Sequence, residues 1–179
     1  MKRLVSLSLV ALLLCAVAAT GCNKKRLDGL VPAHGVVTFN GAPVEGATVV
    51  FSPKQVGTEA VTAQAITDAA GAFKMTTLDP GDGVYPTEYY VTIIKDKIEG
   101  GVSLEEAKDR LENPDKYRGQ EEPEQTIIHE LPVKYGDMNA SGLTITVPEG
   151  GKKDIEFALE GEVDLTPQPL TSGHGGGRR

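Results

Sequence analysis

From residue 33 to residue 160 the chain consists of short stretches in which apolar and polar residues alternate, with turn-forming residues between them. Alternation with a period of two places the apolar side chains on one face, which is typical of a strand with one buried face. In the clearest stretch, Glu88–Ile94, we expect Tyr89, Val91 and Ile93 to face inward. Strands are predicted at seven places: 35–39, 47–52, 62–67, 73–75, 88–94, 143–147 and 155–159.

Turn residues and composition indicate the same fold class. Asn40–Gly41 and Asp68–Gly71 are strong reversal signals, because Asn, Asp and Gly readily adopt the backbone conformations of tight turns. The chain has 21 glycines, 11 prolines and no tryptophan, and 5% of its residues are aromatic, so a core must consist mainly of Val, Ile, Leu and Ala. We predict an all-β domain over 33–160, folded as a seven-stranded two-layer β-sandwich.

Residues 96–126 interrupt this rhythm and are predicted to form an insertion with one short helix. Ser103–Glu106 is a capping box, which satisfies backbone amides at a helix start, and Asn113–Pro114 ends the helix. One face of this helix is apolar: Leu104, Ala107 and Leu111. Residues 161–179 are polar and rich in glycine, and we expect them to form a disordered tail.

Residues 1–21 have the pattern of a secretory signal. Lys2 and Arg3 precede an apolar run, Leu4–Ala19, and small residues follow it. The run is short for a transmembrane helix, which needs about 20 apolar residues. We therefore interpret this segment as an export signal that is removed.

The end of that segment reads Ala19-Thr20-Gly21-Cys22, which resembles the lipobox of bacterial lipoproteins. The resemblance implies transfer of diacylglycerol to the Cys22 sulfur, cleavage before this residue, and anchoring by fatty acyl chains such as palmitate. Ala19 departs from the pattern, since leucine is more usual there. The rival interpretation is ordinary cleavage after Ala18, which would leave a free thiol. Residues 22–32 are the predicted tether, and Asn23 in place of aspartate favours the outer membrane over the inner.

Three runs of the predicted sandwich carry a second resemblance: HGVVTFNGAPVEGATVVFSP, AITDAAGAFKMTT and EYYVTI. They are similar to the carboxypeptidase-regulatory-like family, whose fold is a transthyretin-like (prealbumin-like) β-sandwich. The later run LPVKYGDMNASGLTITV, followed by IEFAL, resembles the ending of small bacterial lipoproteins that carry this domain. Thr87 departs from the family, which often has glycine there. The resemblance implies an accessory or binding module and transfers no catalytic residue.

Charge and histidine spacing narrow the function classes. The net charge is -7, and removing residues 1–21 leaves 16 basic against 25 acidic residues, or about -9. Such a surface repels phosphate backbones, so we expect no nucleic-acid partner. His34, His129 and His174 lack the spacing of a zinc site. We therefore expect no metal and no cofactor.

One motif suggests an enzyme as the weaker alternative. Tyr117-Arg118-Gly119 is similar to the Tyr-Arg-Gly-Ser ending of transthyretin-like hydroxyisourate hydrolases, but Gln120 replaces the serine and the motif lies within the predicted insertion. A hydrolase would require a cleft that brings His34 close to Arg118. We expect the chain not to be an enzyme.

Two sets of residues are candidates for ligand contacts. Tyr85 and Tyr90 could stack on sugars, or could be ordinary surface tyrosines. Oxygen-bearing residues in loops could hold calcium or simply form turns: Asp79, Asp82, Asp137 and Asn139. The sequence thus predicts a lipid-anchored envelope protein with a non-enzymatic module that binds or scaffolds a protein or glycan partner. The alternative is a carbohydrate-binding module at the cell surface.

Overall fold

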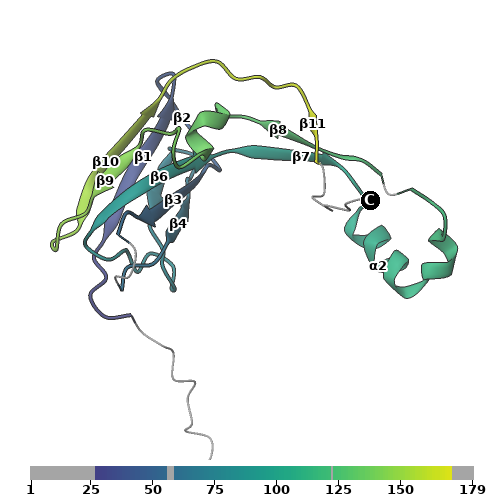
Figure 1. The fold of residues 1–179 in the computed structure, drawn as a ribbon, viewed down its shortest axis with the longest axis horizontal. Helices are drawn as coiled ribbons and strands as arrows, with labels where there is room; N and C mark the ends of the chain where they lie inside the picture. Colours follow the sequence, from purple (N-terminus) through teal and green to yellow (C-terminus); the bar gives the residue numbers. More distant parts are fainter. Residues whose placement is uncertain (1–26, 56–58, 122, 171–179) are drawn as a thin grey trace, which may run out of the picture.

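The computed structural model describes residues 27–55, 59–121 and 123–170 (Figure 1). The predicted signal segment, Cys22 and residues 171–179, including His174, lie outside the described residues. Within the described part of the chain, no helix is both long enough and apolar enough to cross a membrane.

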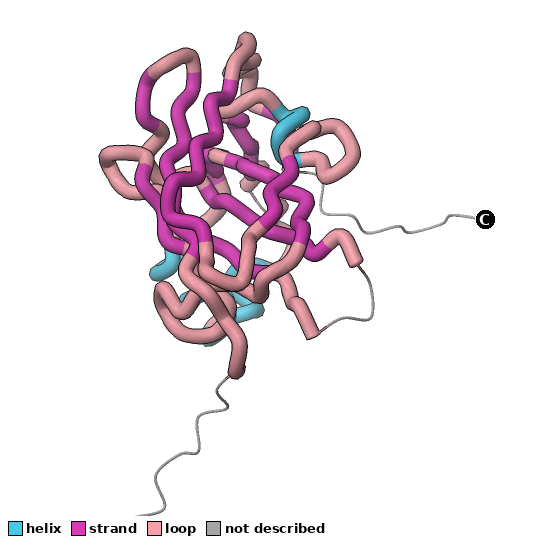
Figure 2. Tube along the Cα trace, turned by 90° about the vertical axis from the view of Figure 1, so that its left-hand side faces the viewer, coloured by secondary structure: helices cyan, strands magenta, loops and turns pink. Residues whose placement is uncertain are grey.

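Two sheets form the sandwich, and strands are its main regular elements (Figure 2). The first sheet contains β10 (Lys152–Leu159), β1 (Ala33–Phe39) and β2 (Ala42–Pro43), with β5 (Ala72–Lys74) also paired to β1. The second sheet has the strand order β4 (Ala63–Ile66), β3 (Thr48–Pro53), β6 (Glu88–Ile94) and β9 (Thr144–Thr146). β1 and β10 run parallel, and the other pairs in these two sheets are antiparallel.

The predicted reversals join the strands as expected. Asn40 and Gly41 both have positive φ angles, 49° and 83°, and they connect β1 to β2. Left-handed conformations at both central residues are what a two-residue hairpin requires. At the second reversal, the Asp68 carboxylate accepts the backbone N–H groups of Ala70 and Ala72 at 2.9 Å each.

The core lies between the two sheets. Tyr89, Val91 and Ile93 are fully buried, so the inward face predicted for β6 is confirmed. Four rings meet in the core: Phe51, Phe73, Phe157 and Tyr89. The aliphatic and alanine-rich core that the composition predicts surrounds them. The fold class predicted from the sequence, an all-β sandwich, is confirmed.

A third sheet and four strands beyond the seven predicted ones are present among the described residues. Besides β2, these are β7 (Asp96–Gly100), β8 (Gln125–His129) and β11 (Gln168–Pro169), in the order β11, β8, β7. β7 and the first two residues of β8 lie within the segment 96–126, which was expected to be an insertion outside the β pattern. The two strands form an antiparallel pair because Asp96 through Gly100 align with His129 through Gln125. Strand pairing at such sequence separation overrides a weak local pattern.

The arm, residues 96–129, extends away from the sandwich (Figure 1). It carries the helix α2 (Leu104–Glu112) and the 3-10 turn η2 (Pro114–Tyr117) between β7 and β8. The predicted cap is confirmed, since the Ser103 hydroxyl accepts the Glu106 N–H at 3.1 Å. Leu104 and Leu111 are 88% and 84% exposed, so the apolar face of α2 is not covered by the described residues.

The predicted disordered tail is wrong for its first part. Gln168 and Pro169 pair with Ile127 and Thr126 of β8, and the Leu170 N–H donates to the Gln125 carbonyl at 2.8 Å. Polar composition correctly indicated the lack of a core in this segment. It could not show that β8 offers an edge whose backbone groups need partners.

The turn η3 (Val133–Gly136) ties this region to the sandwich. Tyr135 is buried, and its hydroxyl donates to the Glu160 carbonyl while accepting the Glu160 N–H, both at 3.0 Å. This contact holds the end of β10 against η3, and so fixes the point at which the chain leaves the sandwich towards β11.

Candidate functional site

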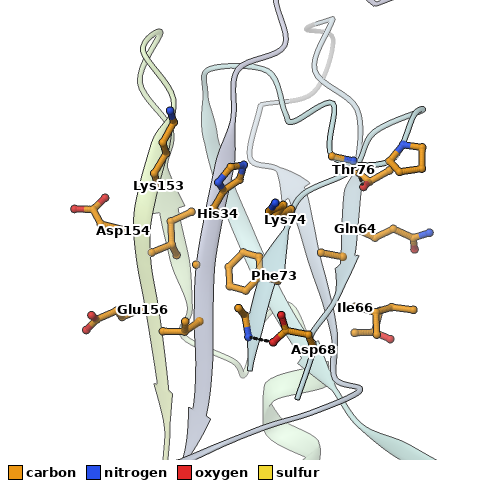
Figure 3. Close-up of a pocket in the computed structure, with 18 residues that line it drawn as sticks. His34, Gln64, Ile66, Asp68, Phe73, Lys74, Thr76, Lys153, Asp154 and Glu156 are labelled. Carbon is orange, nitrogen blue, oxygen red and sulfur yellow. Dashed lines mark hydrogen bonds between the residues drawn. The ribbon is translucent and has the colours of Figure 1, made fainter. Parts of the chain in front are cut away.

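A groove of about 960 Å³ lies on the outer surface where β1 and β5 meet β4 (Figure 3). His34 and Val36 come from β1, Ala72 and Lys74 from β5, and Gln64 and Ile66 from β4. The groove is the largest hollow that we describe on the domain. We therefore take it as the candidate functional site.

Small residues and an incomplete strand pairing create this hollow. β4 is joined to the segment that follows β5 by the isolated Gln64–Thr76 bridge, while the Asp68 N–H donates to the Ala72 carbonyl at 2.9 Å. Between these two points the strands belong to different sheets, so the surface opens. Beneath the opening, Phe73 and Ile155 are buried and give the groove an apolar floor.

Gly35 allows the strands under the groove to approach closely. A Cβ at this position would lie 2.3 Å from the Ile155 carbonyl oxygen and 2.7 Å from the Phe73 ring. No real side chain tolerates backbone at that distance, so any larger residue would push β1 away from β10. The close packing of β1 against β10 beneath the groove therefore depends on this glycine.

Basic side chains from β1, β5 and β10 lie along one side of the groove. His34 and Lys74 are directly opposed in the β1–β5 pair, and the close-up shows them next to each other with Lys153 above (Figure 3). Asp154 and Glu156 point away on the far side of β10 (Figure 3). Asp68 is already committed to the turn amides. The groove thus combines an apolar floor with basic side chains at its rim, while its acidic lining residues point away or cap a turn.

Among the described residues, the groove contains no hydrogen-bonded pair of a nucleophile and a base. A nucleophile needs a base within hydrogen-bond reach and a third group that orients the base. Among the described residues, the His34 ring makes no hydrogen bond, and the Thr76 hydroxyl accepts the Gly81 N–H at 2.9 Å. Arg118 is far from the groove on the arm, where it lies 3.7 Å from Asp115. The groove therefore does not bring His34 and Arg118 together.

The structure does not unite the two candidate tyrosines in one site. Tyr90 is 38% exposed, and the Lys54 ammonium lies 5.3 Å from its ring centroid. Tyr85 is half-buried, and its carbonyl accepts the Tyr89 hydroxyl at 2.7 Å. Neither tyrosine lines the groove. A lysine above the Tyr90 ring occupies a face on which a sugar would otherwise stack.

Two of the acidic residues considered for calcium, Asp82 and Asp137, serve as turn caps. The Asp82 carboxylate accepts three backbone N–H groups, from Thr77 at 2.7 Å and from Leu78 and Asp79 at 2.9 Å. Asp137 likewise accepts the N–H groups of Asn139 and Ala140. No cluster of three metal-binding side chains occurs within the part of the chain that the structure describes. These contacts explain the positions of the Asp82 and Asp137 carboxylates.

The cap at Asp82 leads to a prediction of pH dependence. Burial raises the pKa of this carboxyl, but the donated amides of Thr77, Asp79 and Leu78 outweigh it and leave the pKa below its usual 3.8. A lowered pKa stabilises the fold above the unfolded-state pKa, and this contribution disappears as pH falls through the folded-state value. We expect wild-type stability to decrease below about pH 4, and Asp82→Asn to weaken that decrease.

Urea unfolding measured from pH 7 down to pH 2.5 would check this prediction. At pH 7, Asp82→Ala should lower the free energy of unfolding by about 1–3 kcal/mol, because three amides lose a charged acceptor. Asp154→Ala is the matched control, since Asp154 is exposed and caps no turn. Equal acid sensitivity of Asp82→Asn and the wild type would show that the cap does not set this part of the pH dependence.

Sequence reasoning did not find the groove. Most of its residues are ordinary strand residues that come from β1, β3, β4, β5 and β10, and nothing in their spacing marks a site. The one local signal was the run Gly71-Ala72, where small residues replace the larger ones usual on a strand face. The sequence suggested His34 only as a metal ligand or as part of a hydrolase site with Arg118, and His129 only as a metal ligand. His129 instead lies on the arm, with its Nδ1 atom 2.7 Å from the Asp96 carboxylate.

Comparison with known proteins identifies no family for this chain. No family model and no curated protein sequence matches it. Among solved structures it is similar to a 9R-lipoxygenase from Cyanothece PCC8801, with a TM-score of 0.34 and 15% identity over 81% of this chain and 18% of that one. It is also similar to chlorocatechol 1,2-dioxygenase from Pseudomonas putida, with a TM-score of 0.30 and 14% identity over 76% of this chain and 62% of that one. Similarity at this level bears on neither function nor mechanism.

Proposed function

We propose that this chain is a lipoprotein of the bacterial cell envelope, anchored through Cys22 and preferentially in the outer membrane. Its β-sandwich acts as a non-enzymatic module that binds or scaffolds another envelope component. The observation that carries the proposal is the groove beside β1, β4 and β5, which combines an apolar floor with a charged rim. The lipobox-like sequence at Cys22 supports the location.

A protein partner fits the groove better than a glycan. Protein interfaces concentrate their binding energy in a few large side chains that fill apolar hollows, and a polar rim surrounds them. The groove has this composition, with Ile66 exposed at its edge and His34 and Lys74 at its rim. Sugar sites usually offer an aromatic face, and Phe73, the groove's aromatic lining residue, is buried in the floor. We therefore place a partner's apolar anchor residue in the groove.

The proposal predicts that filling the groove abolishes partner binding. Ala72 lies on β5 at the centre of the groove and is not part of the buried core. Ala72→Arg should occupy the hollow and reduce partner capture at least tenfold, as loss of an interface anchor does. Capture is measured in intact cells with a photoreactive amino acid at Ile66, followed by identification of the crosslinked proteins.

Ala158→Arg is the matched control, because Ala158 is an exposed alanine on β10 of the same sheet and lies outside the groove. Circular dichroism verifies that both variants fold. A specific partner that is lost with Ala72→Arg and kept with Ala158→Arg supports the groove as the binding site. Recovery of the same abundant proteins from both variants, or from a probe placed at Tyr90 instead, would rule it out.

A further inference from the structure

The strand β7 has an open edge on the arm. It pairs with β8 on one side, and no described strand pairs with its other side. All five of its residues are exposed. Such an edge presents unpaired N–H and C=O groups that can accept another strand.

The hydrogen-bond pattern shows which residues face the open edge. The Glu130 N–H donates to the Lys95 carbonyl at 2.7 Å, and the Gly101 N–H donates to the Glu124 carbonyl at 3.2 Å. In an antiparallel pair, alternate residues direct their backbone groups to the same neighbour. Lys97 and Glu99 therefore bond to β8 like Lys95 and Gly101. Asp96, Ile98 and Gly100 direct their backbone groups towards the open edge.

The side chains of β7 are arranged symmetrically about Ile98. Lys97 and Glu99 flank it on one face, and their charged groups are 2.6 Å apart at 59% and 44% exposure. Ile98 lies on the opposite face and is 62% exposed. It is directly opposed to Ile127 of β8, so the two isoleucines form an apolar stripe that ends at the open edge.

We propose that a second copy of this chain pairs with β7, strand against strand, about a two-fold axis at Ile98. In that register Ile98 faces the partner's Ile98, and Lys97 faces the partner's Glu99. The backbone groups of Ile98 point at each other in the orientation that an antiparallel hydrogen-bonded pair requires. The two three-stranded sheets join into one sheet of six strands, and the isoleucine stripe continues across the axis.

The charge pattern favours a second copy over an unrelated strand and fixes the register. An antiparallel axis at Lys97 or at Glu99 would oppose like charges, Lys97 to Lys97 or Glu99 to Glu99. Of these three registers, only the axis at Ile98 places Lys97 opposite Glu99. A two-fold axis makes one surface complementary to itself, and the order Lys97, Ile98, Glu99 has this property. The proposal concerns the arm and does not depend on what the groove binds.

Cysteine crosslinking tests the axis directly. Residues opposed in a hydrogen-bonded antiparallel pair have Cα atoms about 5.5 Å apart, which is within the range of a disulfide. Ile98→Cys in the full chain should form a covalent dimer with itself under mild oxidation. Ile66→Cys is the matched control, an isoleucine 72% exposed on another strand. The wild-type chain, with Cys15 and Cys22, gives the background. No more dimer from Ile98→Cys than from Ile66→Cys would overturn the proposal.

Charge reversal provides a second test that distinguishes pairing from chance collision. Lys97→Glu, added to the Ile98→Cys chain, places four carboxylates at the axis and should reduce crosslinking about tenfold, because like charges opposite each other destabilise a pair. Glu99→Lys in the same background should have the same effect with the opposite sign of charge. Lys97→Glu and Glu99→Lys together restore complementarity within and between copies, so crosslinking should recover. Unchanged crosslinking with either charge reversal alone, or no recovery with both, would refute the two-fold pairing.

Discussion

Cys22→Ser is expected to move the chain quantitatively from the membrane fraction to the soluble fraction. If Cys22 carries two or three acyl chains, as the lipobox resemblance implies, each buried methylene contributes about 0.8 kcal/mol to membrane binding. Serine cannot accept the diacylglycerol, so the whole anchor is lost at once.

Three measurements check this prediction in cells. Labelled palmitate should be incorporated into the wild-type chain and not into Cys22→Ser. Inhibition of lipoprotein signal peptidase should make an unprocessed precursor accumulate. Cys15→Ser is the matched control, since Cys15 lies within the predicted signal segment and its loss should change nothing. A mature chain that begins at Ala19 with a free thiol would contradict the anchor and leave the sandwich unaffected.

The strands of the sandwich could be predicted because apolar and polar residues alternate within them. β6 alternates inward Tyr89, Val91 and Ile93 with outward residues, and each of the three is fully buried. β7 has a single apolar residue, Ile98, and gives no comparable pattern. It becomes a strand because β8 aligns with it after a long loop. Local sequence therefore predicted strands that bury a face, and missed those that exist through backbone pairing.

The candidate site could not be predicted for a related reason. The groove depends on Gly35, Ala72 and Ile66, which come from three strands and meet through the packing of two sheets. None of them has chemistry that marks it in a sequence. The opposite holds for Asp82, whose residue type did suggest a function. Its residue type suggested a calcium ligand, yet its oxygens are used by the backbone of its own loop.

The aromatic cluster in the core connects both sheets of the sandwich. Phe51 on β3 is fully buried. Its ring centroid lies 6.4 Å from Phe73 and 6.2 Å from Phe157 of the first sheet, both edge-on, and 5.5 Å from Tyr89. Burial raises the pKa of Tyr89 to about 12, which keeps its hydroxyl protonated as a donor to the Tyr85 carbonyl. Most of the aromatic contacts between the two sheets thus involve Phe51.

Phe51→Ala should therefore be the most destabilising of the substitutions considered. Removal of a buried phenylalanine ring costs about 3–5 kcal/mol, since both the transfer free energy and the contacts around the resulting cavity are lost. For a domain of this size that corresponds to a decrease in Tm of about 10 °C or more. Urea unfolding followed by tyrosine fluorescence and circular dichroism measures both quantities.

Two further variants show whether the effect comes from the shared core. Leu104→Ala removes a side chain that is 88% exposed on α2, and it should change the free energy of unfolding by less than about 0.5 kcal/mol. Phe51→Leu keeps part of the volume and should cost clearly less than Phe51→Ala. Unfolding of Phe51→Ala should stay cooperative, with all probes shifting together, because the remaining core residues are still shared by both sheets. A cost below about 1 kcal/mol would mean that the cluster does not hold the sandwich together.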